Sequence, residues 1–231
     1  MDWSELQEER ENLKLIEKYQ CFKCILPIDG DHASHSGLID AKLFKQLCDG
    51  IYIDNGNKMY WFDEKAKGNA FFIPPRGLKI SFDRQKLIRW KDSEFNGKKT
   101  ELAAFSEITF LEARGKIKQH MLSSTLTYDV LFELLCKPYA TGYHVPTNFE
   151  ITYPKAITVV IKENLESRPP NEWFTIKVGE IKVDDKHDCD SDKEYEFSMN
   201  IHSEDRKSEL VFKGVQIRPK QPSYGTSSFK I

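Results

Sequence analysis

The feature that most constrains the fold is a series of short β-type runs that continues from Leu78 almost to the end of the chain. The runs are rich in Val, Ile, Thr and aromatic residues, and polar loops separate them. They are Leu78–Phe82, Ile108–Ile117, Thr127–Leu135, Phe149–Tyr153, Ile157–Ile161, Trp173–Val183, Tyr195–Ile201 and Leu210–Ile217. Eight such runs without alternating helical patterns predict an all-β fold, either an antiparallel sandwich or a barrel.

Two of these runs change the face of their apolar residues at a glycine. In "FTIKVGEIKV" the change occurs at Gly179, and in "LVFKGVQI" it occurs at Gly214. A β-bulge inserts one extra residue and so rotates the rest of the strand, and glycine tolerates the unusual dihedral angles there. The sequence therefore predicts bulged, curved strands, and the concave face of a curved two-layer sheet is a common place for a ligand.

The most strand-like segment, "ITFLEARGKIKQHM", carries a charged stripe. Side chains alternate across a strand, so one face holds Leu111, Ala113, Gly115 and Ile117, and the other holds Phe110, Glu112, Arg114 and Lys116. The small residues Ala113 and Gly115 would let a second sheet or a large aromatic ring approach. We interpret the charged face as solvated or salt-bridged in preference to a ligand contact.

Helical and hairpin signals occupy the N-terminal part of the chain. An apolar stripe from Leu6 to Tyr19 predicts an N-terminal helix, and a second short helix from Asp40 ends at Gly50. Turn signals at 55–56 and 67–69 predict an edge hairpin. The expected organisation is a helical extension and linker (1–37), one β-sandwich domain (38–220) and a C-terminal tail (221–231).

Composition narrows the partners and the compartment. The chain has 34 Lys and Arg residues against 36 Asp and Glu, a net charge of −2, so no global positive field attracts nucleic acid. No run approaches the roughly 18 apolar residues of a membrane span, and the polar N-terminus differs from a secretory signal. Five cysteines at irregular spacing favour reduced thiols over a disulfide framework. We expect a cytoplasmic protein.

Motifs for catalysis or metal binding are not found. Cys21 and Cys24 form a C-x-x-C, but no second ligand pair follows to complete a zinc site. The acidic loop at 188–192 lacks the glycine and glutamate of an EF-hand, and the six histidines show no metal spacing. No pair of carboxylates can be assigned to glycoside hydrolysis. We therefore expect no enzymatic activity, no metal and no cofactor.

Several blocks occur together in an order that resembles the phloem lectin family, also called phloem protein 2. The blocks are "FDRQKLIRW", "SEITFLEARGKI", "TYDVLFELLCKPYATGYHVPTNFEI", "EWFTIKVGEI" and "LVFKGVQIRPK". The resemblance covers about Leu38 to Lys220. It implies a two-layer antiparallel β-sandwich (jelly-roll-like), often a homodimer, that binds N-acetylglucosamine oligomers, N-glycan cores and related glycans without metal. It also implies a location in phloem sieve elements and, for some members, RNA association or a role in defence.

The candidate carbohydrate site combines aromatic rings with a few polar groups, because neutral sugars stack on flat rings and form hydrogen bonds through their hydroxyls. The family usually carries further aromatic residues after the tryptophan that matches Trp90, whereas this chain has Phe95 alone. The candidate residues are Trp90, Asp92, Phe95, Tyr139, Tyr143 and His144. Trp90 is equally compatible with packing, Tyr143 and His144 are expected to be exposed in a loop, and Trp173 is expected in the core.

Three functions are kept, in order. The first is a non-enzymatic lectin for N-acetylglucosamine oligomers (chitooligosaccharides). The second is a protein-interaction module that uses the same sandwich together with the N-terminal helix. RNA association is third, because the charge balance gives it little electrostatic support.

Overall fold

The computed structural model describes Gln7 and residues 41–82, 88–183 and 193–220. Four sequence predictions therefore lie outside the described residues: the N-terminal helix apart from Gln7, the C-x-x-C pair, the acidic loop at 188–192 and the tail 221–231. The proposed division at residue 37 stays a prediction for the same reason.

One helix, twelve strands and four short 3-10 turns make up the described chain. The helix and strands are α3 (Ala41–Asp49), β1 (Ile51–Ile53), β2 (Lys58–Asp63), β3 (Gly68–Ile73), β4 (Lys79–Phe82), β5 (Ile88–Phe95), β6 (Lys98–Phe105), β7 (Ile108–Lys118), β8 (Thr127–Thr141), β9 (Thr147–Tyr153), β10 (Ile157–Glu163), β11 (Trp173–Lys182) and β12 (Glu194–Pro219). The 3-10 turns are η1 (Asp54–Gly56), η2 (Pro75–Gly77), η4 (Gln119–Met121) and η5 (Leu165–Ser167).

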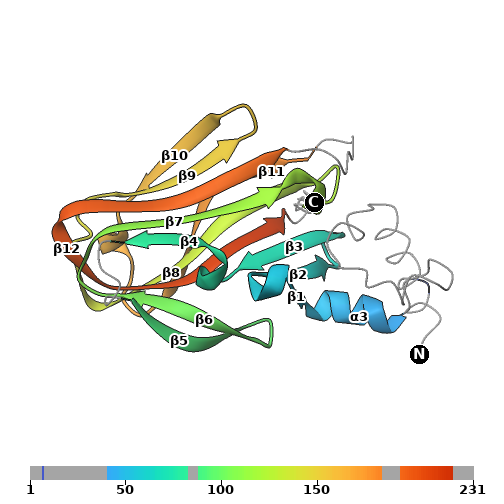
Figure 1. The fold of residues 1–231 in the computed structure, drawn as a ribbon, viewed down its shortest axis with the longest axis horizontal. Helices are drawn as coiled ribbons and strands as arrows, with labels where there is room; N and C mark the ends of the chain where they lie inside the picture. The colour runs from blue at the N-terminus through green and yellow to red at the C-terminus, as the bar shows by residue number, and fades with distance from the viewer. Residues whose placement is uncertain (1–6, 8–40, 83–87, 184–192, 221–231) are drawn as a thin grey trace, which may run out of the picture.

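The strands form two antiparallel layers that the long strand β12 joins (Figure 1). Sheet I has the order β4-β7-β12-β9-β10 and uses the first part of β12, Glu194 to His202. Sheet II uses the last part of β12, Ser208 to Pro219, which pairs with β8, and β8 pairs with β11. The predicted all-β, two-layer antiparallel sandwich is confirmed, with the two runs at Tyr195 and Leu210 merged into one strand.

Aromatic side chains from both sheets meet in the core. Phe132 of β8 lies 5.4 Å, ring centre to ring centre, from Phe149 of β9 and 6.2 Å from Phe197 of β12. Gly115 of β7 lies beneath the Phe197 ring, where a Cβ would come within 2.4 Å of a ring carbon. The small residues of β7 therefore admit a large ring, as the sequence predicted.

Two hairpins pair with the same edge of β12, one after the other. The β1-β2-β3 meander joins through β3, which pairs with Val215 to Ile217, and the β5–β6 hairpin joins through β6, which pairs with Leu210 to Phe212. Gly214 lies between these two segments, at a register shift between β12 and β8. The predicted bulge at Gly179 is also present, as a register shift between β11 and β8.

The β5–β6 hairpin is an element that the sequence reading missed. Its turn is Asn96-Gly97, with both residues at positive φ (48° and 71°). This is the geometry that Asn-Gly favours in a tight hairpin. The signal was present in "RWKDSEFNGKKTELAAF", but the charged residues hid the strand pattern because one face of the hairpin lies in solvent.

Candidate functional site

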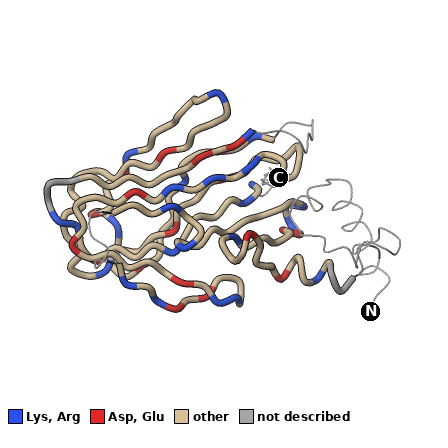
Figure 2. Tube along the Cα trace, in the orientation of Figure 1, with Lys and Arg blue, Asp and Glu red and all other residues tan. Residues whose placement is uncertain are grey.

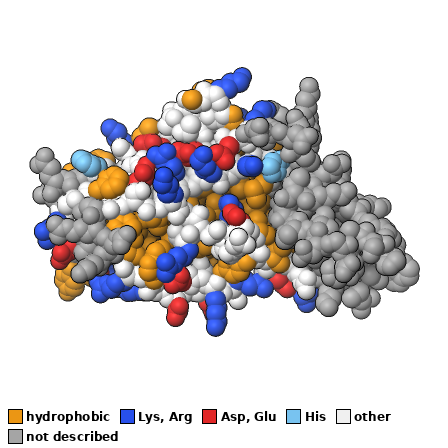
Figure 3. Space-filling model, viewed as in Figure 1, with side chains coloured by type: hydrophobic (Ala, Val, Ile, Leu, Met, Phe, Trp, Pro, Cys, Tyr) orange, Lys and Arg blue, Asp and Glu red, His pale blue; other side chains and the backbone are white. Residues whose placement is uncertain are grey.

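An apolar cleft opens where the edge strands of the two sheets diverge. β4 is an edge of sheet I and β5 is an edge of sheet II, so their inward side chains face a gap instead of a partner strand. The cleft has a volume of about 390 Å³, and its lining residues are Pro75, Arg76, Leu78, Ile80, Phe82, Ile88 and Trp90. Figure 3 shows hydrophobic side chains reaching the surface on this side of the molecule, below a row of charged ones.

Arg76 forms one wall of the apolar cleft. Its guanidinium carbon lies 3.6 Å from the centre of the Trp90 ring, and its Nε donates a hydrogen bond to Glu101 Oε2 at 2.8 Å. Stacking of a guanidinium on an indole is favourable because the ring face carries negative electrostatic potential. Arg76 therefore covers one face of Trp90 and leaves the opposite face for a ligand.

A second, polar cleft of about 300 Å³ shares Arg76 with the first. Its lining residues are Tyr52, Gly56, Pro74, Arg76, Asp92, Lys99, Thr100 and Glu101. Tyr52 donates a hydrogen bond to the carbonyl oxygen of Lys99, which ties the β1 strand to the β5–β6 hairpin. The exposed carboxylate of Asp92 and the hydroxyl of Tyr52 thus lie next to an apolar cleft, the combination that a polyhydroxylated ligand needs.

Arg76 is a site residue that sequence reasoning missed. It is held by η2, where Gly77 packs so closely on the turn before β2 that a Cβ would lie 1.9 Å from the carbonyl oxygen of Asn57. The segment "PPRGL" marks a turn in the sequence, but nothing local indicates that Arg76 reaches Trp90 fourteen positions later.

Two of the predicted site residues are buried and are removed from the site. Phe95 is 8% exposed and stacks on Phe72 with ring centres 4.0 Å apart, because the β5–β6 hairpin places it on the outer face of sheet II. Tyr143 is 1% exposed, so the expectation of an exposed loop position is wrong for this residue. Burial also raises the pKa of its hydroxyl well above the ordinary value.

The remaining candidates are separated. Trp90 and Asp92 line the two adjoining clefts, whereas Tyr139 and His144 line neither of them. Tyr139 is 91% exposed at the end of β8, and His144 is exposed in the loop that follows. Trp173, which was expected in the core, is instead 43% exposed, because its position in β11 points to the outer face of sheet II.

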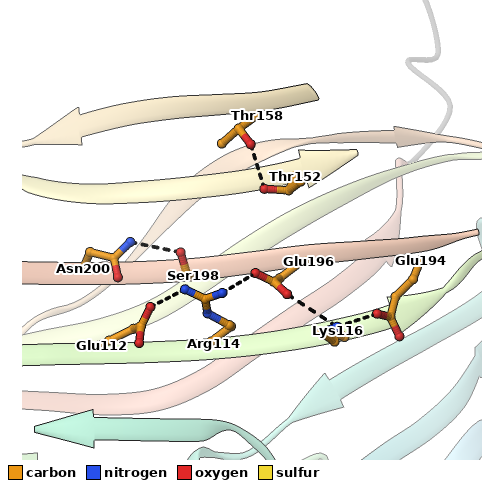
Figure 4. A network of polar contacts seen from close by, with 9 residues as sticks. All are labelled: Glu112, Arg114, Lys116, Thr152, Thr158, Glu194, Glu196, Ser198 and Asn200. Atoms are coloured by element: carbon orange, nitrogen blue, oxygen red, sulfur yellow. Dashed lines mark hydrogen bonds and ion pairs between the residues drawn. The ribbon is translucent and has the colours of Figure 1, made fainter. Parts of the chain in front are cut away.

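The charged stripe on β7 is neutralised by acidic residues (Figure 4). Arg114 donates hydrogen bonds to Glu112 and to Glu196 Oε1, the latter at 2.7 Å, and Lys116 donates one to Glu194 Oε1 at 2.7 Å. These contacts raise the pKa of both basic groups, chiefly through Glu112 for Arg114 and Glu194 for Lys116. Lys, Arg, Asp and Glu are interspersed along the whole trace (Figure 2). The stripe is therefore salt-bridged.

We expect the substitution Arg114→Ala to lower the free energy of unfolding by about 1 kcal/mol or less. The Arg114 side chain is 41% exposed, and ion pairs in contact with water contribute little because solvent screens them. Urea denaturation followed by tryptophan fluorescence measures the change. A loss above about 2 kcal/mol would show that the stripe is a structural network and not a solvated surface.

Groups for covalent or metal chemistry are not assembled in the described residues. Burial raises the pKa of the Cys48 thiol to about 12 and that of Cys136 to about 11, so both thiols are protonated and unreactive at neutral pH. No three His, Cys, Asp or Glu side chains within the described ranges lie close enough to hold a metal ion. Among the helices described, none is long and apolar enough to cross a membrane.

The fold and the two clefts together define an antiparallel β-sandwich protein with a binding surface at the open edge of its layers. The family model of phloem protein 2 matches residues 68–219. A lectin of Luffa acutangula is 32% identical over 181 residues, which cover 78% of this chain and 85% of the relative. The chain therefore belongs to the phloem protein 2 family.

Two further comparisons are more distant. Protein PHLOEM PROTEIN 2-LIKE A2 of Arabidopsis thaliana is 32% identical over 123 residues, 53% of this chain and 62% of the relative. Among solved structures, a family 35 carbohydrate binding module from Clostridium thermocellum covers 64% of this chain and 96% of that one. That match has 8% identity and a TM-score of 0.38.

Proposed function

We propose that this chain is a carbohydrate-binding lectin that holds N-acetylglucosamine oligomers in the two adjoining clefts beside Arg76. The observation that carries the proposal is the position of Trp90, which has one face against Arg76 and lies in an apolar cleft next to a polar one. The name of the Luffa acutangula relative supports the class of ligand. Family membership supports a location in phloem.

In this proposal the two clefts have different roles. The open face of Trp90 and the side chains of Ile80 and Ile88 contact the apolar face of one sugar ring. Asp92 accepts hydrogen bonds from hydroxyls of the next ring, and the Tyr52 oxygen is an additional acceptor. No step forms or breaks a covalent bond, so the function is binding.

The substitution Trp90→Ala tests the proposal. We expect it to weaken binding of chitotriose by on the order of 1–3 kcal/mol, about 5- to 150-fold, because it removes the flat contact surface of the cleft. Isothermal titration calorimetry measures the affinity, and a thermal melt checks that the variant stays folded. Binding of wild type should depend little on salt, because a neutral ligand displaces few counterions.

The matched control is Arg114→Ala, which removes a partly exposed side chain from the opposite side of sheet I. It should leave chitotriose affinity unchanged, because its guanidinium is already paired with two carboxylates. If Arg114→Ala abolishes binding while a folded Trp90→Ala binds normally, the cleft is not the site.

One observation favours the alternative of a protein-interaction module. Strand β10 pairs with β9 alone among the described strands, and it exposes Ile157 (60%), Val159 (43%) and Val160 (47%). An edge strand with apolar side chains is a surface on which a second chain can pair. Absence of binding to every N-acetylglucosamine oligomer at millimolar concentration would favour this reading, with a homodimer as its simplest form.

A further inference from the structure

The outer face of sheet II carries an aligned row of side chains across five strands. The register pairs Trp173 with Leu135, Leu135 with Val211, Val211 with Ala104, and Ala104 with Arg89. Residues paired across neighbouring strands point to the same side of a sheet, so these five share one face. At about 4.8 Å per strand, the row spans roughly 19 Å, the length of a short oligosaccharide rather than of a single ring.

The two ends of this row differ in chemistry. Trp173 is 43% exposed at one end, while Val211 and Ala104 form a buried apolar floor in the middle. Between them, the Nζ of Lys213 lies 5.3 Å from the centre of the Trp173 ring and 2.7 Å from Glu133 Oε1. Lys213 is therefore neutralised, and the exposed indole is held beside a polar group.

The far end of the row is a cluster of three cations that share one carboxylate. Arg89 lies 4.0 Å from Glu209, at the limit of an ion pair. Lys91 of β5 and Lys137 of β8 lie close enough that the charge of Lys137 is the largest cause lowering the pKa of Lys91. Within the described ranges neither lysine forms an ion pair, in contrast to Arg114, Lys116 and Lys213.

Two ammonium groups in contact are unfavourable unless an anion lies between them. A carboxylate or sulfate group placed there would accept hydrogen bonds from both and remove their repulsion. A row that begins at an exposed tryptophan and ends at such a cluster matches a chain of sugar rings that carries acid groups.

We propose that the outer face of sheet II is a second saccharide site, which binds acidic oligosaccharides through Trp173 and the Lys91–Lys137 pair. A ring stacks on Trp173, and an acid group two or three rings away binds both lysines. The inference extends the proposed function to a second ligand class and rests on it only in taking the ligand to be a saccharide. A polyphosphate chain such as RNA fits this face less well, because Glu133 and Glu209 lie on it and the whole chain carries a net charge of −2.

The experiment uses the full chain and two matched probes, trigalacturonic acid and its neutral methyl ester. We expect the acid to bind at least about tenfold more tightly than the ester at low salt, and its affinity to fall as salt is raised. The double substitution Lys91→Gln with Lys137→Gln should remove that difference. Trp173→Ala should weaken both probes by about tenfold, because stacking does not depend on the acid group.

The control pair is Lys79→Gln with Lys118→Gln, which removes the same charge from exposed positions of sheet I. It should leave the affinity for trigalacturonic acid within about twofold, because those lysines are remote from the row. Equal affinity for acid and ester, undetectable binding of the acid, an equal loss in the control pair, or tighter binding of single-stranded RNA than of the acid would each overturn the proposal.

Chitotriose separates this proposal from the first one. The Lys91–Lys137 double variant should bind chitotriose as wild type does, and Trp90→Ala should keep its affinity for trigalacturonic acid. Loss of chitotriose binding in the double variant would contradict two separate sites. Failure of chitotriose to bind wild type, with acid binding intact, would reject the cleft proposal alone.

Discussion

The substitution Tyr143→Ala should destabilise the protein by about 3–5 kcal/mol, the usual cost of deleting a buried aromatic ring. Tyr143 is 1% exposed, and the Nζ of Lys207 lies 5.0 Å from the centre of its ring. Lys207 is itself 1% exposed and donates a hydrogen bond to the carbonyl oxygen of Gly142. Removing the ring would open a cavity beside a buried ammonium group, so the loss combines packing with a disturbed polar contact.

Urea denaturation of Tyr143→Ala measures this loss, and Tyr139→Ala is the matched control. Tyr139 lies four positions earlier and is 91% exposed, so its truncation should change the free energy of unfolding by about 0.5 kcal/mol or less. Any loss of glycan binding in Tyr143→Ala should then follow the unfolded fraction. A folded, fully stable Tyr143→Ala variant that fails to bind sugar would return Tyr143 to the site.

The substitution Gly214→Ala should have an effect of similar size through the backbone. Gly214 has φ of +141°, and a Cβ there would lie 2.4 Å from the carbonyl oxygen of Ile73 and 2.8 Å from the Phe72 ring. We expect a loss of about 3–5 kcal/mol, which combines about 1–3 for the backbone conformation with about 1–3 for the overlap. Urea denaturation again gives the value.

Gly97→Ala isolates the conformational part of that cost. Gly97 also has positive φ, +71°, but no atom lies within 4 Å of the position of its Cβ. It should lose only about 1–2 kcal/mol. Equal losses in the two variants would show that the close approach of β3 to β12 at Gly214 contributes nothing, and that the bulge tolerates a side chain.

Much of the fold could be predicted because the strand pattern is local. The glycines at 179 and 214 revealed both bulges, since a change in alternation is visible within ten residues. The positive-φ turns at Asn55 and Lys67 and the end of α3 at Gly50 were predicted for the same reason. The β5–β6 hairpin was missed although Asn96-Gly97 marked it, because charged residues obscured its alternation.

The candidate site was predicted less well. Trp90 and Asp92 were chosen by position in the chain and line the clefts, but Phe95 and Tyr143 are buried and Trp173 is exposed. An aromatic residue in a strand has the same local pattern whether its face meets the other sheet or solvent. Which of the two holds depends on the opposite layer, and no neighbour in the sequence records it.

The amino-acid sequence by itself determined the strands, their turns and the two bulges, because backbone conformation and alternation are properties of neighbouring residues. The tertiary structure alone decided that Arg76 covers Trp90, that acidic residues of β12 neutralise the stripe on β7, and that Lys91 lies beside Lys137. Each of these contacts joins residues on different strands. Their charges and rings acquire a role only when the two sheets pack and fix which strands are neighbours.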